Sequence, residues 1–231
     1  MHKLALALLL SAALVAPALA QKPEEAKKEA AKVKVPRDTF FKGQTANQYL
    51  ARERLIGAKV VNKDGQAVGT VDDLILSQGG QMEGIVVGVG GIVGVGAKQT
   101  NVRTSALKIA TSGGKATITI PGATKEKLGT PEYPKTASQY LARERLIGAK
   151  VVNAEGQALG TVDDLILSQG GKIEGMLMGV GGVLGVGAKQ IGVRSSALKI
   201  APSDGKATIT LANGTKEMLD AVGAYQRPTK K

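Results

Sequence analysis

Short segments of the chain alternate apolar and polar residues with a period of two. KATITI at 115–120 places its alanine and both isoleucines on one face and its threonines on the other, as in a half-buried strand. AKVVN at 58–62 and MEGIVVGV at 82–89 are more continuously apolar and predict more deeply buried strands. Turn dipeptides such as Asp64-Gly65 separate these segments. Short strands with turn signals between them predict an all-β fold, a small barrel or sandwich.

One predicted strand, AVGTVDDLILS at 67–77, breaks its own alternation. Val71 and Leu74 are both apolar, yet they cannot share a face of a regular strand because successive side chains point to opposite sides. The conflict predicts a bend or bulge at Asp72 and Asp73.

Two helical segments flank the strands. TANQYLARERL at 45–55 offers Thr45 as an N-cap and then good helix formers, and Gly57 follows, so a short helix from Thr45 is expected. TKEKL at 124–128 predicts a closing helical turn after the last strand.

The whole pattern occurs twice. QYLARERLIGAKVVN begins at Gln48 and again at Gln139, and the match continues without insertion or deletion to TKEKL and TKEML. Apolar residues replace one another between the copies, as at Val68 and Leu159, and packed interiors tolerate such exchanges best. We therefore expect two tandem domains, each with its own helix, barrel and closing turn, and these positions in the cores.

The two ends of the chain differ from the repeats. His2 and Lys3 precede an apolar run and then Ala18-Leu19-Ala20, the pattern of a signal peptide cleaved after Ala20. The run is too short to span a membrane, so we expect a periplasmic or secreted protein without a transmembrane anchor. The predicted divisions are a signal peptide (1–20), a charged flexible linker (21–44), a first domain (45–129), a proline-containing linker (130–135), a second domain (136–222) and a disordered basic tail (223–231).

Composition removes several kinds of chemistry. The chain has no cysteine, and its only histidine, His2, lies in the predicted signal peptide. Disulfides are thereby excluded, and the mature chain lacks the commonest zinc and copper ligands. Catalysis by Ser-His-Asp or Cys-His groups is excluded as well. No metal or cofactor is predicted.

The formal net charge of +12 favours acidic partners. The basic residues are dispersed among acidic ones, however, and no block of five or six like charges occurs, so an ordinary soluble surface is the favoured interpretation of the charge. Aromatic residues make up only 3% of the chain, which argues against a nucleic-acid platform built on base stacking.

A glycine-rich stretch, GVGGIVGVGAKQ at 88–99, returns at 179–190 as GVGGVLGVGAKQ. A dinucleotide-binding G-x-G-x-x-G would need glycine at Val93 and at Leu184, so its spacing fails in both copies. No Lys-Ser or Lys-Thr pair follows, which excludes a P-loop, and no helix is predicted next. The glycines are therefore interpreted as allowing a bulge, a tight corner or the close approach of two backbones.

The chain resembles the PRC-barrel family, named for the photosynthetic reaction-centre H subunit and including the C-terminal domain of a ribosome maturation factor. The resemblance lies in an opening LIGxxV, then xDGxxVGxVDDLIL, a glycine-rich GVGGxxGxG and a closing SAL, at Leu55–Ile109 and Leu146–Ile200. VRTSAL and VRSSAL lack the proline often found just before this stretch. The resemblance implies compact β-barrels that serve as interaction modules without chemistry of their own. With its signal peptide, the chain is similar to periplasmic PRC-barrel proteins of proteobacteria.

We therefore expect a non-catalytic envelope adaptor that binds a protein partner or self-associates. An anionic polymer, an acidic glycan or nucleic acid, is the alternative ligand. The candidate contact residues are basic: Arg52, Arg54, Lys98, Arg143, Arg145 and Lys189.

An enzyme is the competing hypothesis. The carboxylates that it could use are Asp72, Asp73 and Glu83, with Asp163, Asp164 and Glu174 in the second copy. Acid–base catalysis needs carboxyl groups that converge on one substrate, whereas neighbours on a strand diverge. Calcium binding by these groups would lack ligands. We expect a hydrogen-bonded structural role for the aspartates and no catalytic residue.

Overall fold

The computed structural model describes residues 35–36, 38–90, 98–111, 114–129, 136–181, 187–201 and 205–228. The described residues belong to one unit, Val33–Lys231. The predicted signal peptide and the linker 130–135 lie outside the described residues.

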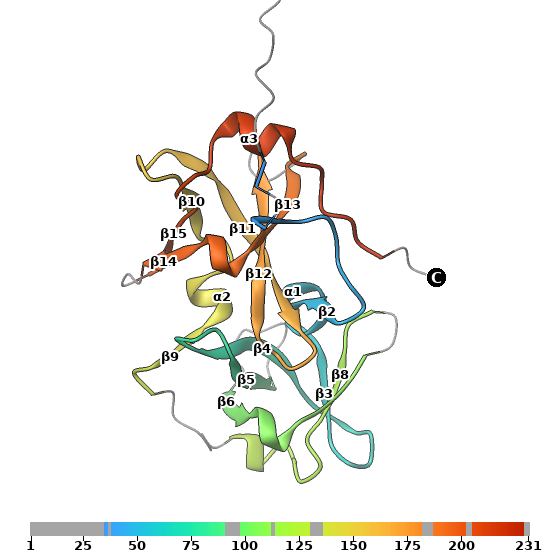
Figure 1. Cartoon of the computed structure of the whole chain (residues 1–231). Coiled ribbons are helices and arrows are strands. Elements are labelled where there is room, and N and C mark those ends of the chain that lie inside the picture. Colours follow the sequence, from blue (N-terminus) through green and yellow to red (C-terminus); the bar gives the residue numbers. More distant parts are fainter. Residues whose placement is uncertain are drawn as a thin grey trace, which may run out of the picture. The chain divides into compact units, whose positions relative to one another are not determined.

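Each repeat forms its own mostly antiparallel sheet, which confirms the all-β prediction (Figure 1). The first sheet has the strand order β6-β5-β4-β3-β8-β7, in which β3 and β8 run parallel. Its strands are β3 (Lys59–Val61), β4 (Ala67–Ser77), β5 (Met82–Val89), β6 (Lys98–Arg103), β7 (Lys108–Ala110) and β8 (Thr117–Thr119).

The second sheet repeats this order as β13-β12-β11-β10-β15-β14 and carries an additional strand, β1 (Phe40–Phe41), on β13. Its other strands are β10 (Lys150–Val152), β11 (Ala158–Ser168), β12 (Ile173–Val180), β13 (Lys189–Arg194), β14 (Lys199–Ala201) and β15 (Thr208–Thr210). Each repeat also has two short helices after its strands. In the first repeat, η1 (Thr104–Ala106) follows β6 and η2 (Lys127–Gly129) follows β8; in the second, η3 (Ser195–Ala197) follows β13 and α3 (Lys216–Ala221) follows β15. The closing helical turn is therefore present in both repeats, as η2 and α3. Among the described residues, no helix is long and apolar enough to cross a membrane.

The predicted break in β4 is a β-bulge. Val71 pairs with Val87, but the next pair joins Asp73 to Val86, so Asp72 is the extra residue. The bulge turns Val71 and Leu74 to the same side, and both are fully buried. The conflict in the hydrophobic pattern thus located the irregularity correctly.

The core contains the residues that the pattern placed there. The inward-facing residues predicted for 115–120, Ala116, Ile118 and Ile120, are buried. The exchanged apolar pair Val68 and Leu159 is buried too. Side chains from both repeats form one continuous hydrophobic cluster, so the two domains share a core instead of standing apart.

The opening segment of each repeat packs on the sheet of the other repeat. β2 (Gln48–Leu50) pairs with β11, and β9 (Gln139–Leu141) pairs with β4. α1 (Ala51–Arg54) and α2 (Ala142–Arg145) follow these strands. The β4–β5 and β11–β12 turns also join, because Met82 donates its backbone N–H to Gly171 and Ile173 to Gly80.

The prediction of a helix starting at Thr45 is therefore wrong. The helix begins at Ala51, and residues 48–50 are extended. The physical reason is the exchange: β11 supplies backbone partners for this segment, and a pattern within one repeat carries no trace of them. Gly57, expected to end the helix, adopts φ of 79° three residues after its last residue.

Two flanking segments are more ordered than the sequence predicted. Residues 38–44 were expected in a flexible linker, yet Phe40 and Phe41 are buried and form β1. Residues from 223 were expected in a disordered tail, yet Tyr225 is buried and Gln226 exchanges backbone hydrogen bonds with Lys42 and Gln44. The apolar surface of the aromatic side chains explains the correction, because their burial favours order. Residues 229–231 lie outside the described residues.

Candidate functional site

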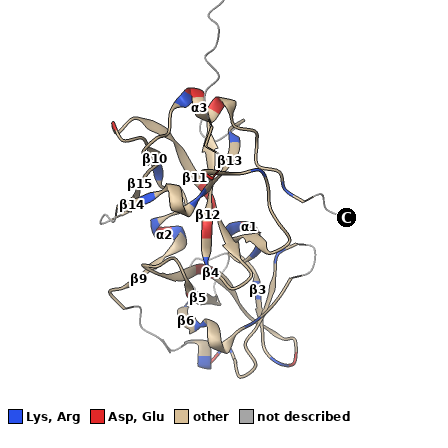
Figure 2. Ribbon diagram, in the orientation of Figure 1, with Lys and Arg blue, Asp and Glu red and all other residues tan. Residues whose placement is uncertain are grey.

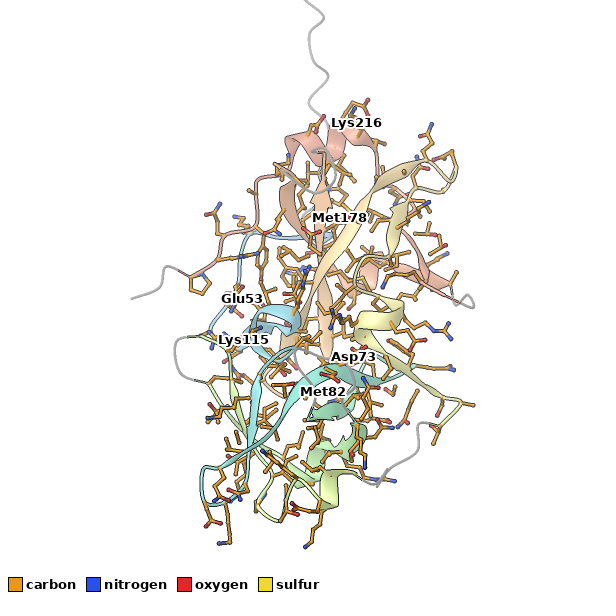
Figure 3. All side chains as sticks on the ribbon, turned by 180° about the vertical axis from the view of Figure 1, so that it is seen from behind. Glu53, Asp73, Met82, Lys115, Met178 and Lys216 are labelled. Atoms are coloured by element: carbon orange, nitrogen blue, oxygen red, sulfur yellow. The ribbon has the colours of Figure 1, made fainter. Side chains whose placement is uncertain are left out.

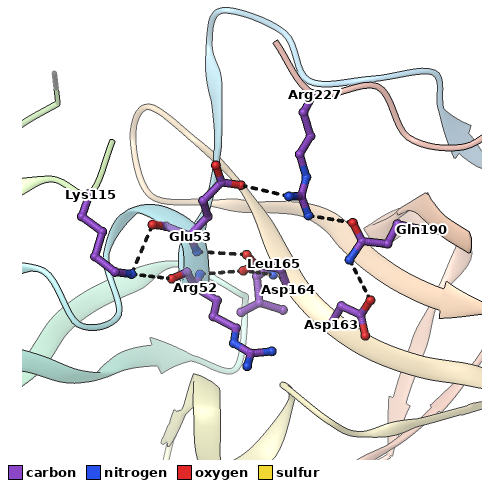
Figure 4. Close-up of polar contacts among 8 residues, drawn as sticks. All are labelled: Arg52, Glu53, Lys115, Asp163, Asp164, Leu165, Gln190 and Arg227. Carbon is purple, nitrogen blue, oxygen red and sulfur yellow. Dashed lines mark hydrogen bonds and ion pairs between the residues drawn. The ribbon is translucent and has the colours of Figure 1, made fainter. Parts of the chain in front are cut away.

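Two buried aspartates hold the exchanged helices in place. Asp164, on β11, accepts backbone N–H bonds from Arg52 (2.6 Å) and Glu53 (3.1 Å) at the start of α1 (Figure 4). Asp73, on β4, accepts the equivalent bonds at α2, from Arg143 (2.7 Å) and from the next residue (3.2 Å). Each carboxylate thus satisfies the free N–H groups of a helix that belongs to the other repeat.

Burial sets the protonation behaviour of this pair. It raises the pKa of Asp164 to about 6 and also raises the pKa of Asp73. Three backbone N–H donors at each carboxylate, the third from the following leucine, oppose the shift but are outweighed by desolvation. Figure 3 shows Asp73 beside α2, where its bonds give it the structural role that the sequence predicted.

The neighbouring aspartates point elsewhere. Asp72 accepts a bond from Gln99 at 3.0 Å, and Asp163 accepts one from Gln190 at 2.9 Å. Gly88, which pairs with Thr70 on the neighbouring strand, makes room for Asp72, because a Cβ at Gly88 would lie 2.5 Å from an Asp72 oxygen.

The two glutamates bind the exchanged strands. Glu83 accepts from the Gln139 side chain, and Glu174 accepts from Gln48. The three candidate carboxylates of each repeat therefore have separate hydrogen-bond partners. Among the described residues, no group of three metal-ligating side chains occurs.

A cleft of about 1080 Å³ lies between the repeats and is lined by equivalent residues from both. Asp72 and Asp163 line it, as do Gly57 and Gly148. Its basic residues are Arg52, Arg143, Lys115, Lys206 and Lys125. Figure 2 shows basic residues on both α1 and α2, and of these Arg52 and Arg143 line the cleft. The cleft thus collects more positive than negative side chains.

Two of these cations support the helices. Lys115 Nζ donates to the carbonyls of Arg52 (3.1 Å), Glu53 (3.3 Å) and Ile56 (2.6 Å), at the C-terminal end of α1 (Figures 3 and 4). Lys206 Nζ donates to the Arg143 carbonyl at 2.7 Å in the other repeat. A cation at a helix C-terminus is favourable. The sequence reasoning missed both lysines, although Lys115 and Lys206 are the first residues of the two copies of KATIT.

The arginines at the start of the helices are differently placed. The side chains of Arg52 and Arg143 are exposed and line the cleft. Neither guanidinium forms a hydrogen bond or ion pair with another described residue. In Figure 4 the Arg52 side chain extends away from the contacts that its backbone makes.

The six predicted contact residues do not form one surface. Only Arg52 and Arg143 line the central cleft; Arg54 and Arg145 line two other, smaller cavities. Lys98 is exposed at the start of β6.

The side chain of Lys189 is bound within the protein. Its Nζ donates to the carbonyls of Leu219, Asp220 and Val222 at 2.7, 2.9 and 3.0 Å, at the end of α3.

The glycine-rich stretch is part of a β-structure where it is described. β5 ends at Val89, and β6 is already a strand at Lys98. Gly90 has φ of 73°, which favours glycine. Close approach of backbones, as predicted, occurs within the stretch at Gly88, whose carbonyl oxygen lies 2.5 Å from the position of a Cβ on Gly69. Residues 91–97 and 182–186, with Val93 and Leu184, lie outside the described residues.

Comparison with known proteins places these observations in a family. No curated protein matches the sequence. The PRC-barrel domain family matches residues 48–125 and 139–211, which together are more than half of the chain and begin at the two exchanged strands. The chain therefore belongs to the PRC-barrel domain family, with two copies of the domain.

Proposed function

We propose that the protein is a non-catalytic interaction protein of the cell envelope, in which the paired repeats bind a partner protein. PRC-barrel domains are in general non-catalytic β-barrel modules. One observation carries the proposal: the buried carboxylates of Asp73 and Asp164 hold the exchanged helices, while the cations Arg52 and Arg143 remain exposed in the cleft between the repeats.

Export is supported by the N-terminal sequence. A basic start, a short apolar run and Ala18-Leu19-Ala20 have the order that signal peptidase substrates share. The absence of cysteine suits a protein that must fold in an oxidising compartment without disulfides. Both features support a periplasmic or secreted site of action.

Cross-linking in cells tests the proposal. The protein is expressed with a C-terminal tag, cross-linked in the intact envelope and recovered with its partners. We expect a mature N-terminus at Gln21 and one envelope protein that is recovered stoichiometrically, and that in turn recovers this chain when it carries the tag. A version lacking residues 1–20 serves as the control and should stay inside the cell without this partner. Recovery only of the uncleaved chain, or of no reciprocal partner, would contradict the proposal.

Binding of an anionic polymer, an acidic glycan or nucleic acid, is the second candidate, favoured by the net charge of +12. Retention on heparin that decreases steeply with salt, compared with a neutral matrix, supports it. Equal elution from both matrices contradicts it.

A further inference from the structure

We propose that the cleft between the repeats binds an acidic segment of a partner polypeptide through its carboxylates, which pair with Arg52 and Arg143. The inference rests on the proposed interaction function and specifies the site and its ligand. It is built on the placement of the two arginines, on their surroundings and on the mixed charge of the cleft.

The backbone N–H and the backbone carbonyl of each arginine both form hydrogen bonds. The N–H of Arg52 donates to Asp164 at 2.6 Å, and its carbonyl accepts from Lys115 at 3.1 Å. Arg143 has the same pair of contacts, with Asp73 at 2.7 Å and Lys206 at 2.7 Å. Both side chains therefore start from anchored positions, one in each repeat, and reach the same cleft. A preorganised site loses less conformational entropy when a ligand binds.

The guanidinium groups are available to a ligand. Both side chains are exposed, and neither guanidinium has a hydrogen-bond or ion-pair partner among the described residues. Each acts electrostatically on the buried aspartate at its helix, Arg52 on Asp164 and Arg143 on Asp73. A guanidinium presents its N–H donors in a planar fork that matches a carboxylate in a bidentate pair. Two guanidinium groups at equivalent positions in the cleft favour a ligand with at least two carboxylates.

The acidic residues of the cleft favour a polypeptide over a polyphosphate. Asp72 and Asp163 line the cleft, and each accepts one bond through Oδ2 from a glutamine. Their remaining oxygens would repel a dense row of phosphates, but they can accept N–H groups from a peptide backbone. Aromatic side chains are absent from the described lining, so bases would have nothing on which to stack.

Gly90 leaves room in the cleft. It lines the cleft, and a Cβ built on it would meet no atom within 4 Å. A peptide can therefore approach the backbone at this position without meeting a side chain.

Fluorescence anisotropy with the full chain tests the site. The probe is a labelled ten-residue peptide of alternating glutamate and glycine, titrated at one fixed, low salt concentration. We expect R52Q/R143Q to weaken binding at least tenfold, and each single change to weaken it by a similar, smaller factor. The matched control is K108Q/K199Q, which removes the same charge from exposed, equivalent positions outside the cleft and should bind within twofold of the unchanged protein. If both double variants lose binding equally, the cleft is not the site.

A second measurement leaves the arginines intact. Because the chain has no cysteine, Thr70→Cys introduces a single thiol into the cleft, and Lys63→Cys introduces one at an exposed turn outside it. The peptide should slow maleimide labelling of the first thiol several-fold and leave the second unchanged. Equal labelling of both with and without peptide would overturn the proposal, even if the arginine variants fold poorly.

Two further outcomes separate this inference from the proposed function. Inorganic polyphosphate or heparin that binds more tightly than the peptide, with the same loss in R52Q/R143Q, overturns the choice of a polypeptide ligand. If no acidic probe binds but cross-linking recovers a reciprocal partner, the cleft proposal is wrong and the interaction function stands. An acidic segment identified in that partner, with binding lost in R52Q/R143Q, supports both.

Discussion

The buried carboxylate of Asp164, in the second repeat, binds the start of helix α1 in the first repeat. Asp164 is only 5% exposed and accepts two N–H bonds from α1 in addition to the one from Leu165. The bonds favour the charged form and burial favours the neutral form, and burial prevails because the pKa is raised to about 6. The ionised Asp164 carboxylate therefore caps α1 only at the cost of its own desolvation.

This balance predicts how stability depends on pH. Because the pKa of Asp164 is about 6 in the folded protein and near its ordinary value when unfolded, the folded state binds the proton more strongly between pH 4 and 6. The free energy of unfolding should therefore decrease as the pH rises through this range, by roughly 2 to 3 kcal/mol at most from this residue. Asp164→Asn removes the titration and should flatten the decrease, measured by urea unfolding at several pH values.

The equivalent aspartate provides the comparison. The pKa of Asp73 is shifted in the same direction by the same causes, so Asp73→Asn should also flatten the profile, and the double variant should flatten it further. A D164N protein whose profile keeps the full slope of the unchanged protein would show that Asp164 ionises normally in its buried position.

At the scale of single elements, local patterns were informative wherever an element's partners lie nearby in the sequence. The strands, the turns, the bulge at Asp72 and the closing helical turns all follow from alternation, glycine and caps. The exchanged strand β2 does not, because its partner β11 belongs to the other repeat, and a pattern within one repeat carries no trace of that partner. The cleft was missed for the same reason: it exists only between the repeats.

The sequence does contain an indication that the flanking segments 38–44 and 223–228 are ordered, although their many charged residues suggested a flexible linker and tail. Phe40, Phe41 and Tyr225 are rare aromatic residues in charged segments. Phe41 and Tyr225 pack together in a small cluster with Leu50 and Ile166, whereas Phe40 belongs to the shared core. Arg194 adds a cation–π contact over the Phe41 ring at 4.2 Å.

The duplication offers a matched pair of substitutions for this element. A Cβ at Gly192 would lie 2.6 Å from the Tyr225 ring and 3.1 Å from the Phe41 Cβ. Gly192→Asn, which copies Asn101 of the first repeat, should therefore displace β1 and Tyr225 and destabilise the protein by about 1 to 3 kcal/mol. Urea unfolding gives the loss, and hydrogen exchange at 38–44 and 223–228 should become faster.

The reverse change is the control. Asn101 is half-buried in β6, and Asn101→Gly should cost less than about 1 kcal/mol, the usual penalty of glycine in a strand. If G192N leaves hydrogen exchange of the flanks unchanged, the close packing around Gly192 is not what keeps them ordered.

At the scale of the whole molecule, the exchange makes the covalent link between the repeats dispensable for their association. β2 and β9 each complete the sheet of the other repeat, Asp73 and Asp164 fix the helices that follow, and the apolar core is shared. Two copies joined in this way behave as the halves of an intertwined dimer that happen to lie on one chain.

Cutting the chain between the repeats tests this view. Residues 130–135 are replaced by a protease recognition site, and the folded full-length protein is cleaved. We expect the two fragments to elute together at the mass of the intact protein, because the reciprocal contacts remain. The thermal midpoint should become dependent on protein concentration after cleavage and be independent of it before, since association is then bimolecular. The uncut protein with the same inserted site is the control; fragments that separate at micromolar concentration without denaturant would show that the linker, and not the exchange, holds the repeats together.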